Sequence, residues 1–239
     1  MEMTTREAAE RLAVTQDRIG VLVRSGALDA RRVGSQWLLD ADSVDRQAAL
    51  MSAGARGRSM APRSAWAVAE LADDGMAEWM HRVERSRLRK RLEDLDAVEV
   101  VQRWLRARAQ TVMNYRVGED DIEDLLSAEG VVATGVSAAD AYGLSLGTGG
   151  SADAYVTKAV AKRLEGDFML IPSRTGNLTL RIVDDDLYLR SAHQIERHCV
   201  AARLIVGADL ADDTDTRTKS AGRALIQDVL SEHQWRLTR

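Results

Sequence analysis

The sequence predicts an α+β protein of several units, and three observations lead to this fold class. Helical patterns of apolar residues, with one hairpin pattern among them, occupy most of the chain up to about residue 115. Strand-like and helical segments then alternate, most clearly where Leu178, Leu180 and Ile182 line one face of an alternating run. A chain of 239 residues is also long enough for two or three small units.

Composition and charge divide the chain into four expected parts. Residues 1–116 carry 20 Lys and Arg against 17 Asp and Glu, whereas residues 117–239 carry 13 against 20. A weakly positive first half suits contact with DNA, and the acidic half suits another partner or solubility alone. The expected parts are a helix-turn-helix unit with a hairpin at residues 1–53, a basic linker at 54–63, a helical middle region at 64–130, and an acidic α/β domain for dimerisation or partner binding at 131–239.

The first unit opens on two short helices. Thr4 and Glu7 have the spacing of a capping box, so a helix should begin there. Thr15 is a suitable N-cap for a second helix, and Gly26 suits its C-terminal cap. The positions expected to be apolar and inward-facing are Ala8, Ala9, Leu12, Ile19, Leu22 and Val23.

A small hairpin is expected after the second helix. Gly34-Ser35 joins two short runs and suits a turn that needs positive φ at its first position. Val33 and Trp37 are expected to pack back on the helices. The pattern is that of the wing in a winged helix-turn-helix.

This block resembles the excisionase family of winged helix-turn-helix proteins. The landmarks that carry the resemblance are Thr5, Glu7-Ala8-Ala9, Leu12, Val14-Thr15, Gly26-Ala27-Leu28 and Trp37. The resemblance implies DNA binding through the second helix and the wing. Some such folds serve only as protein contacts, so this alternative stays open.

Candidate DNA contacts follow from the geometry of the major groove, which admits one helix and lets its first turns reach base edges. Gln16, Arg18 and Arg24 are the expected base readers, with Thr15 and the helix N-terminus on phosphate. The full expected set is Thr15, Gln16, Asp17, Arg18, Arg24, Arg31, Arg32, Ser35 and Gln36.

The middle of the chain is expected to be helical. Helices are predicted from Ser43 to about Ala53, from Pro62 until Gly75 ends the pattern, and from Met76 to about Tyr115. Cations in the linker and in these helices could extend the DNA contact, or could form a solvated face paired with nearby acidic residues. The possible phosphate contacts are Arg56, Arg58, Arg63, Arg87, Arg89 and Lys90.

The last part reads as a small mixed α/β domain. Strands are predicted at 153–156, 167–171 and 178–183, and helices at 157–165, 201–210 and 219–233. Pieces of this region and of the middle, including Val131 to Leu144, resemble actinobacterial regulators with a tail similar to AbiEi-type antitoxins. The chain departs from that pattern at Ala202-Arg203-Leu204. The resemblance implies an autorepressing antitoxin of the type IV kind, with a nucleotidyltransferase toxin as partner.

Nothing in the sequence predicts an enzyme. Gly147 to Gly150 lacks the Lys-Ser/Thr of a P-loop, and His193, His198 and Cys199 lack a second cluster at zinc spacing. We therefore expect no catalytic residues, no metal and no cofactor. A single cysteine, with no signal peptide or membrane span, predicts a cytoplasmic protein.

The function expected from these patterns is sequence-specific transcriptional regulation, with double-stranded DNA as partner and a homodimer as a further expectation. Two alternatives stay open. One is an excisionase-like architectural factor that bends DNA, and the other is a protein-interaction module with a degenerate helix-turn-helix.

Overall fold

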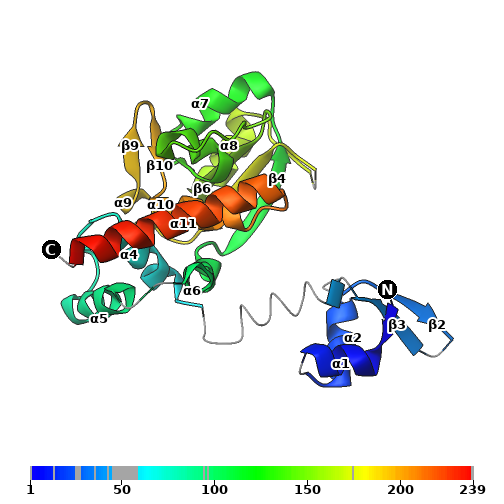
Figure 1. Cartoon of the computed structure of the whole chain (residues 1–239). Helices are drawn as coiled ribbons and strands as arrows, with labels where there is room; N and C mark the ends of the chain where they lie inside the picture. The colour runs from blue at the N-terminus through cyan, green and yellow to red at the C-terminus, as the bar shows by residue number, and fades with distance from the viewer. Residues whose placement is uncertain are drawn as a thin grey trace. The chain divides into compact units, whose positions relative to one another are not determined.

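The computed structural model describes residues 2–12, 14–24, 28–34, 36–41, 43–44, 59–93, 95, 97–173 and 175–237 (Figure 1). The chain forms two compact units, Met1–Arg58 and Ser59–Arg239. Helices and strands occur in both units, as the predicted α+β class requires. Among the described residues, no helix combines the length and the apolar character needed to cross a membrane.

The first unit packs two helices against a small antiparallel sheet. Its elements are β1 (Glu2–Thr4), α1 (Thr5–Leu12), α2 (Gln16–Arg24), β2 (Ala30–Val33) and β3 (Gln36–Asp40). The sheet has the order β1-β3-β2. Its core is formed by Ala8, Leu12, Ile19, Leu22 and Leu39, most of which the apolar periodicity predicts. Strand β1 was not predicted, because its three residues pair only with β3, far along the chain.

The two predicted N-terminal caps are confirmed, whereas the C-terminal cap predicted at Gly26 lies outside the described residues. The backbone N–H of Thr4 donates to Glu7 Oε2 at 2.7 Å, and the N–H of Glu7 donates to Thr4 Oγ1 at 3.3 Å. The bond from the Thr4 backbone, followed by that from its hydroxyl, lowers the pKa of Glu7. At α2, the N–H of Arg18 donates to Thr15 Oγ1 at 3.3 Å. Local chemistry therefore sets where both helices begin.

The second unit is built on a sheet of seven strands in the order β7-β4-β8-β6-β5-β10-β9. Its helices are α4 (Pro62–Ala72), α5 (Arg82–Glu93), α6 (Val98–Trp104), α7 (Ile122–Leu126), α8 (Lys158–Asp167), α9 (Leu187–Arg190), α10 (Arg203–Ala211) and α11 (Thr216–Leu237), with short 3-10 turns η1 (Leu105–Ala107), η2 (Glu119–Asp121), η3 (Gly135–Ala138) and η4 (Asp140–Tyr142). Its strands are β4 (Thr111–Arg116), β5 (Val132–Ala133), β6 (Ala152–Thr157), β7 (Ile171–Pro172), β8 (Leu178–Val183), β9 (His193–Ile195) and β10 (His198–Val200).

The two faces of this sheet carry separate cores. One core joins α7 and α8 to the face that bears Leu178 and Leu180. The other joins α4, α6, α10 and α11 to the face that bears Tyr155. Strands β6 and β8 are parallel and are connected through α8, whereas β4 runs antiparallel to β8. The predicted elements at 153–156, 157–165 and 178–183 correspond to this β6-α8-β8 connection.

Three sequence predictions for the second unit are wrong. The predicted helix from Met76 to Tyr115 is instead α5, α6 and strand β4, because pairing with β8 makes residues 111–116 extended. That pairing also joins the predicted middle region and the predicted acidic domain in one sheet, so no boundary lies at residue 130. The predicted strand at 167–171 is mostly the end of α8 and a turn, with only the two residues of β7 extended.

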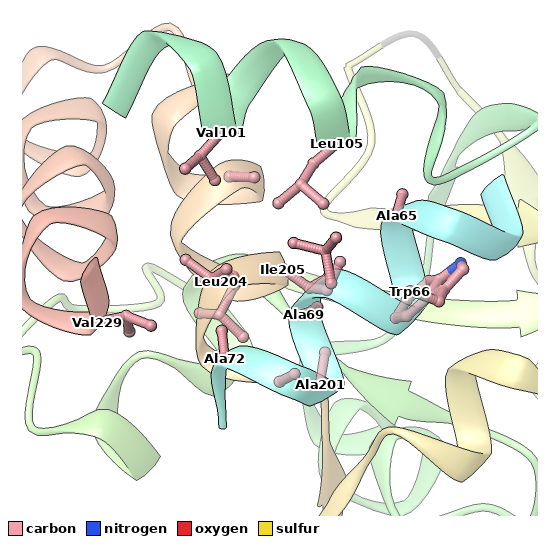
Figure 2. Packing of buried hydrophobic residues seen from close by; sticks show 14 of the residues in the cluster. Ala65, Trp66, Ala69, Ala72, Val101, Leu105, Ala201, Leu204, Ile205 and Val229 are labelled. Atoms are coloured by element: carbon pink, nitrogen blue, oxygen red, sulfur yellow. The ribbon is translucent and has the colours of Figure 1, made fainter. Parts of the chain in front are cut away.

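The helical core is centred on α4 and α10 (Figure 2). Trp66 is 1% exposed and stands edge-on to the ring of Tyr155, with 4.9 Å between the ring centroids. Its indole Nε1 donates to the carbonyl oxygen of Arg108 at 3.2 Å. Trp66 is therefore a core residue, as the low aromatic content of the chain predicts. Of the predicted helix from Ser43 to Ala53, the structure describes only residues 43 and 44, both helical.

Candidate nucleic-acid interface

The first turn of α2 presents a row of exposed polar side chains. Ile19 and Leu22 bury the opposite side of the helix in the core of the first unit. As a consequence Thr15, Gln16, Asp17 and Arg18 all lie on the surface. The unpaired N–H groups and the dipole of a helix N-terminus favour an anion at this end. These residue types can also read base edges, since Arg pairs with guanine and Gln with adenine.

The hairpin of the first unit adds two exposed arginines. Arg31 and Arg32 lie on β2, opposite Leu38 and Trp37 of β3. Trp37 is 37% exposed, so its side chain lies partly at the surface, and its packing on the helices stays a prediction.

For five of the predicted DNA contacts, the structure describes either the backbone alone or nothing. Ser35, Arg56 and Arg58 lie outside the described residues. For Arg24 at the end of α2 and Gln36 at the start of β3, only the backbone is described. Their predicted roles stay predictions.

In the second unit, two of the predicted phosphate contacts are engaged within the fold. The guanidinium of Arg63 donates from Nη2 to the carbonyl oxygen of Trp79 at 2.5 Å and lies 5.3 Å from the Trp79 ring centroid. Arg89 is half-buried, and its Nη2 lies 3.8 Å from the sulfur of Met76. These two arginines stabilise local structure. Arg87 and Lys90 are exposed on α5.

A buried charge network, which sequence reasoning missed, lies between α10 and the sheet. The carboxylate of Asp209 on α10 is fully buried, and Arg108 donates from Nε to its Oδ1 at 2.8 Å. Arg181 Nε on β8 lies 3.2 Å from the same oxygen, and Tyr155 donates to it at 3.1 Å. Thr134 Oγ1 donates to the other oxygen at 2.5 Å. One carboxylate thus joins residues from five separate segments.

Contacts within this network shift the pKa values of Arg108 and Tyr155. Burial alone would lower the pKa of Arg108, but the Asp209 carboxylate outweighs it and raises that pKa. Burial, with the charge of Asp209, raises the pKa of Tyr155. Asp209 and Arg108 are closed off from solvent, so removal of either charge would leave the other buried without its partner. A sequence signal was present, since Asp209 is the one charged residue within the apolar run 204–211.

A cavity of about 290 Å³ lies beside this network and is lined by Asp153, Thr179, Asn177 and residues of the 147–152 loop. Burial raises the pKa of Asp153 to about 6, against the opposing effect of the Arg181 guanidinium. A carboxyl group with a raised pKa stabilises the folded state at low pH and loses that contribution as the pH rises.

The pKa of Asp153 leads to a prediction about pH. The contribution of Asp153 should be complete below about pH 4 and lost as the pH passes about 6, a difference of about 3 kcal/mol in unfolding free energy. Asp153→Asn should therefore flatten the fall in stability between these values in urea titrations. Asp120→Asn, on the exposed turn η2, serves as the control and should leave the slope unchanged. Equal slopes for wild type and Asp153→Asn would contradict the assignment.

The three residues considered for metal binding have other neighbours. His193 Nε2 lies 3.3 Å from Asp73 Oδ2, and His198 Nε2 lies 3.4 Å from Glu123 Oε1. The hydrogen bond with Asp73 raises the pKa of His193. The Cys199 thiol donates to the Gln194 side chain at 3.2 Å. Across the described residues, no three His, Cys, Asp or Glu side chains are grouped to hold a metal ion.

Comparison of the chain with family models, curated proteins and solved structures finds no match.

Proposed function

We propose that this chain is a sequence-specific DNA-binding transcriptional regulator whose first unit acts as a winged helix-turn-helix. The observation that carries the proposal is the exposed first turn of α2, residues 15–18, in the same unit as the arginine-bearing hairpin. A helix of this kind fits the major groove, and a hairpin beside it can hold the phosphate backbone.

The roles of the side chains follow from their chemistry. Arg18 and Gln16 read base edges, because each can form two hydrogen bonds with one base. Thr15 caps α2 and lies where the helix N-terminus would meet a phosphate. Asp17 is an acceptor that can take a hydrogen bond from cytosine. Arg31 and Arg32 contact the backbone.

The second unit serves dimerisation or partner binding in this proposal. Residues 59–239 carry 24 Lys and Arg against 29 Asp and Glu, so its overall charge does not favour DNA. The resemblance to AbiEi-type antitoxins extends the proposal to an autorepressor whose partner is a nucleotidyltransferase toxin. Repression would result from occupation of promoter DNA by paired subunits at two half-sites.

Arg18→Ala tests the reading role directly. Loss of a bidentate contact should cost about 1 to 3 kcal/mol on the specific site, or about 5-fold to 150-fold in affinity. Binding to a random duplex should fall far less. The measurement is equilibrium binding of the full chain to DNA from upstream of its own gene and to a scrambled duplex.

The matched control is Arg6→Ala, which removes the same charge from the exposed face of α1, where Arg6 pairs with Glu10 at 3.2 Å. It should leave the ratio of specific to random binding unchanged. Equal losses on both duplexes for Arg18→Ala would make Arg18 a phosphate contact and refute its reading role. Binding of the wild type to neither duplex would refute the proposed function.

A further inference from the structure

Helix α5 is a strongly basic element in an acidic unit. Its twelve residues include six cations, Arg82, Arg85, Arg87, Arg89, Lys90 and Arg91, and only two carboxylates, Glu84 and Glu93. The unit as a whole has more acidic than basic residues. Helix α5 thus carries a net charge of +4 (six cations minus two carboxylates), and it packs against α4 and α11 away from the sheet (Figure 1).

The cations of α5 divide into two groups with different surroundings. Leu88 and Leu92 form the buried stripe, and Arg85 and Arg89 flank it. Arg85 donates from Nη1 to the carbonyl oxygen of Met76 at 3.2 Å, so these two arginines hold the segment before the helix. The remaining cations, which we call the α5 basic face, are exposed: Arg82, Arg87, Lys90 and Arg91.

The α5 basic face has no acidic partner within the part of the chain that the structure describes. Glu84 and Glu93 are exposed on the same helix, yet neither forms an ion pair with these cations. Lys90 and Arg91 stand three and four residues after Arg87, spacings at which like charges repel and destabilise a helix. Ion pairs of these cations with Glu84 and Glu93, which the predicted alternative requires, are therefore not observed, and Asp94, its third acidic residue, lies outside the described residues.

We propose that the α5 basic face is a second DNA contact, which binds the phosphate backbone without reading sequence. This inference rests on the proposed function and adds a role for the second unit. Three of its four cations are arginines, whose planar guanidinium can bind a phosphate through two hydrogen bonds. Because both units belong to one chain, binding by α2 raises the effective concentration of DNA at α5.

DNA fits this face better than an acidic protein does. Protein interfaces depend on buried apolar and aromatic anchors at their centre, and Val83 is the one apolar side chain exposed on α5. Interfaces with DNA are more polar and much more positively charged. A face made of cations with no central anchor therefore suits a phosphate backbone.

The test is the triple variant Arg87→Gln/Lys90→Gln/Arg91→Gln of the full chain. Each lost phosphate contact reduces the slope of log affinity against log salt by about 0.9, so the slope should fall by about 2 to 3. Specific and random duplexes should lose affinity by the same factor, since the contact is to the backbone. Helix stability should not decrease, because like-charge repulsion is relieved.

The matched control is Lys158→Gln/Lys162→Gln/Lys219→Gln, which removes the same charge from exposed positions on α8 and α11. This control should keep the wild-type salt slope. Equal slopes for the two triple variants would overturn the proposal and leave an acidic protein as the partner of α5. A changed ratio of specific to random binding in the α5 variant would also overturn it, because the face would then read sequence.

The outcomes separate this inference from the proposed function. If the wild type selects its own upstream DNA and the α5 variant keeps the wild-type slope, only the inference fails. If the wild type binds neither duplex, both fail.

Discussion

Asp209→Ala should destabilise the second unit by about 3 to 5 kcal/mol in unfolding free energy. The substitution leaves the buried Arg108 and the half-buried Arg181 with no carboxylate between them, since both guanidinium groups now meet at Asp209. It also removes the acceptor of the Tyr155 and Thr134 hydroxyls. The loss should be seen in urea unfolding followed by tryptophan fluorescence, because four of the five tryptophans lie in residues 59–239.

Asp212→Ala is the control for this prediction. Asp212 also binds Arg108, with 2.6 Å between its Oδ2 and Nη2, but its side chain is 52% exposed. Water can replace this partner, so the variant should lose about 1 kcal/mol or less. Similar losses for the two variants would contradict the view that the buried carboxylate holds the network together.

Gly222→Ala should cost about 3 kcal/mol, because α10 and α11 cross with their backbones in contact. A Cβ atom on Gly222 would lie 2.5 Å from the carbonyl oxygen of Gly207 and 2.7 Å from the Leu210 Cβ. Neither neighbour can move without separating the two helices. Thermal unfolding of the full chain would show the second unit melting earlier.

The matched control is Gly166→Ala on α8, where nothing lies within 4 Å of an added Cβ. Alanine there should stabilise the helix by about 0.4 to 1 kcal/mol. The same change from glycine to alanine should therefore destabilise the protein at position 222 and stabilise it at position 166. A Gly222→Ala variant as stable as the wild type would show that the helices do not cross this closely.

The features predicted from the sequence are those decided by local chemistry. The Thr4 and Glu7 cap, the apolar stripe of α2, and the β6-α8-β8 segment all depend on residues close together in the chain. The exposed first turn of α2 follows from the same stripe. Most of the candidate interface can therefore be predicted from the sequence.

The features missed depend on partners far along the chain. Strand β4 shows little alternation, with Thr111 to Asn114 exposed, and its extended form follows from pairing with β8. The Asp209 network joins side chains that are up to 101 residues apart. Arg63 is a residue type that often contacts phosphate, but its guanidinium lies against the Trp79 ring and stabilises local structure. Charge patterns alone cannot show which cations are already engaged.

The proposed function depends on specific DNA binding. The most direct test measures binding of the full chain to DNA from upstream of its own gene and to a scrambled duplex, across a salt series. We expect a preference for the upstream DNA of about a thousandfold or more that persists at physiological salt. Weak binding to both duplexes, lost steeply as salt rises, would contradict it and leave only a general attraction to phosphate.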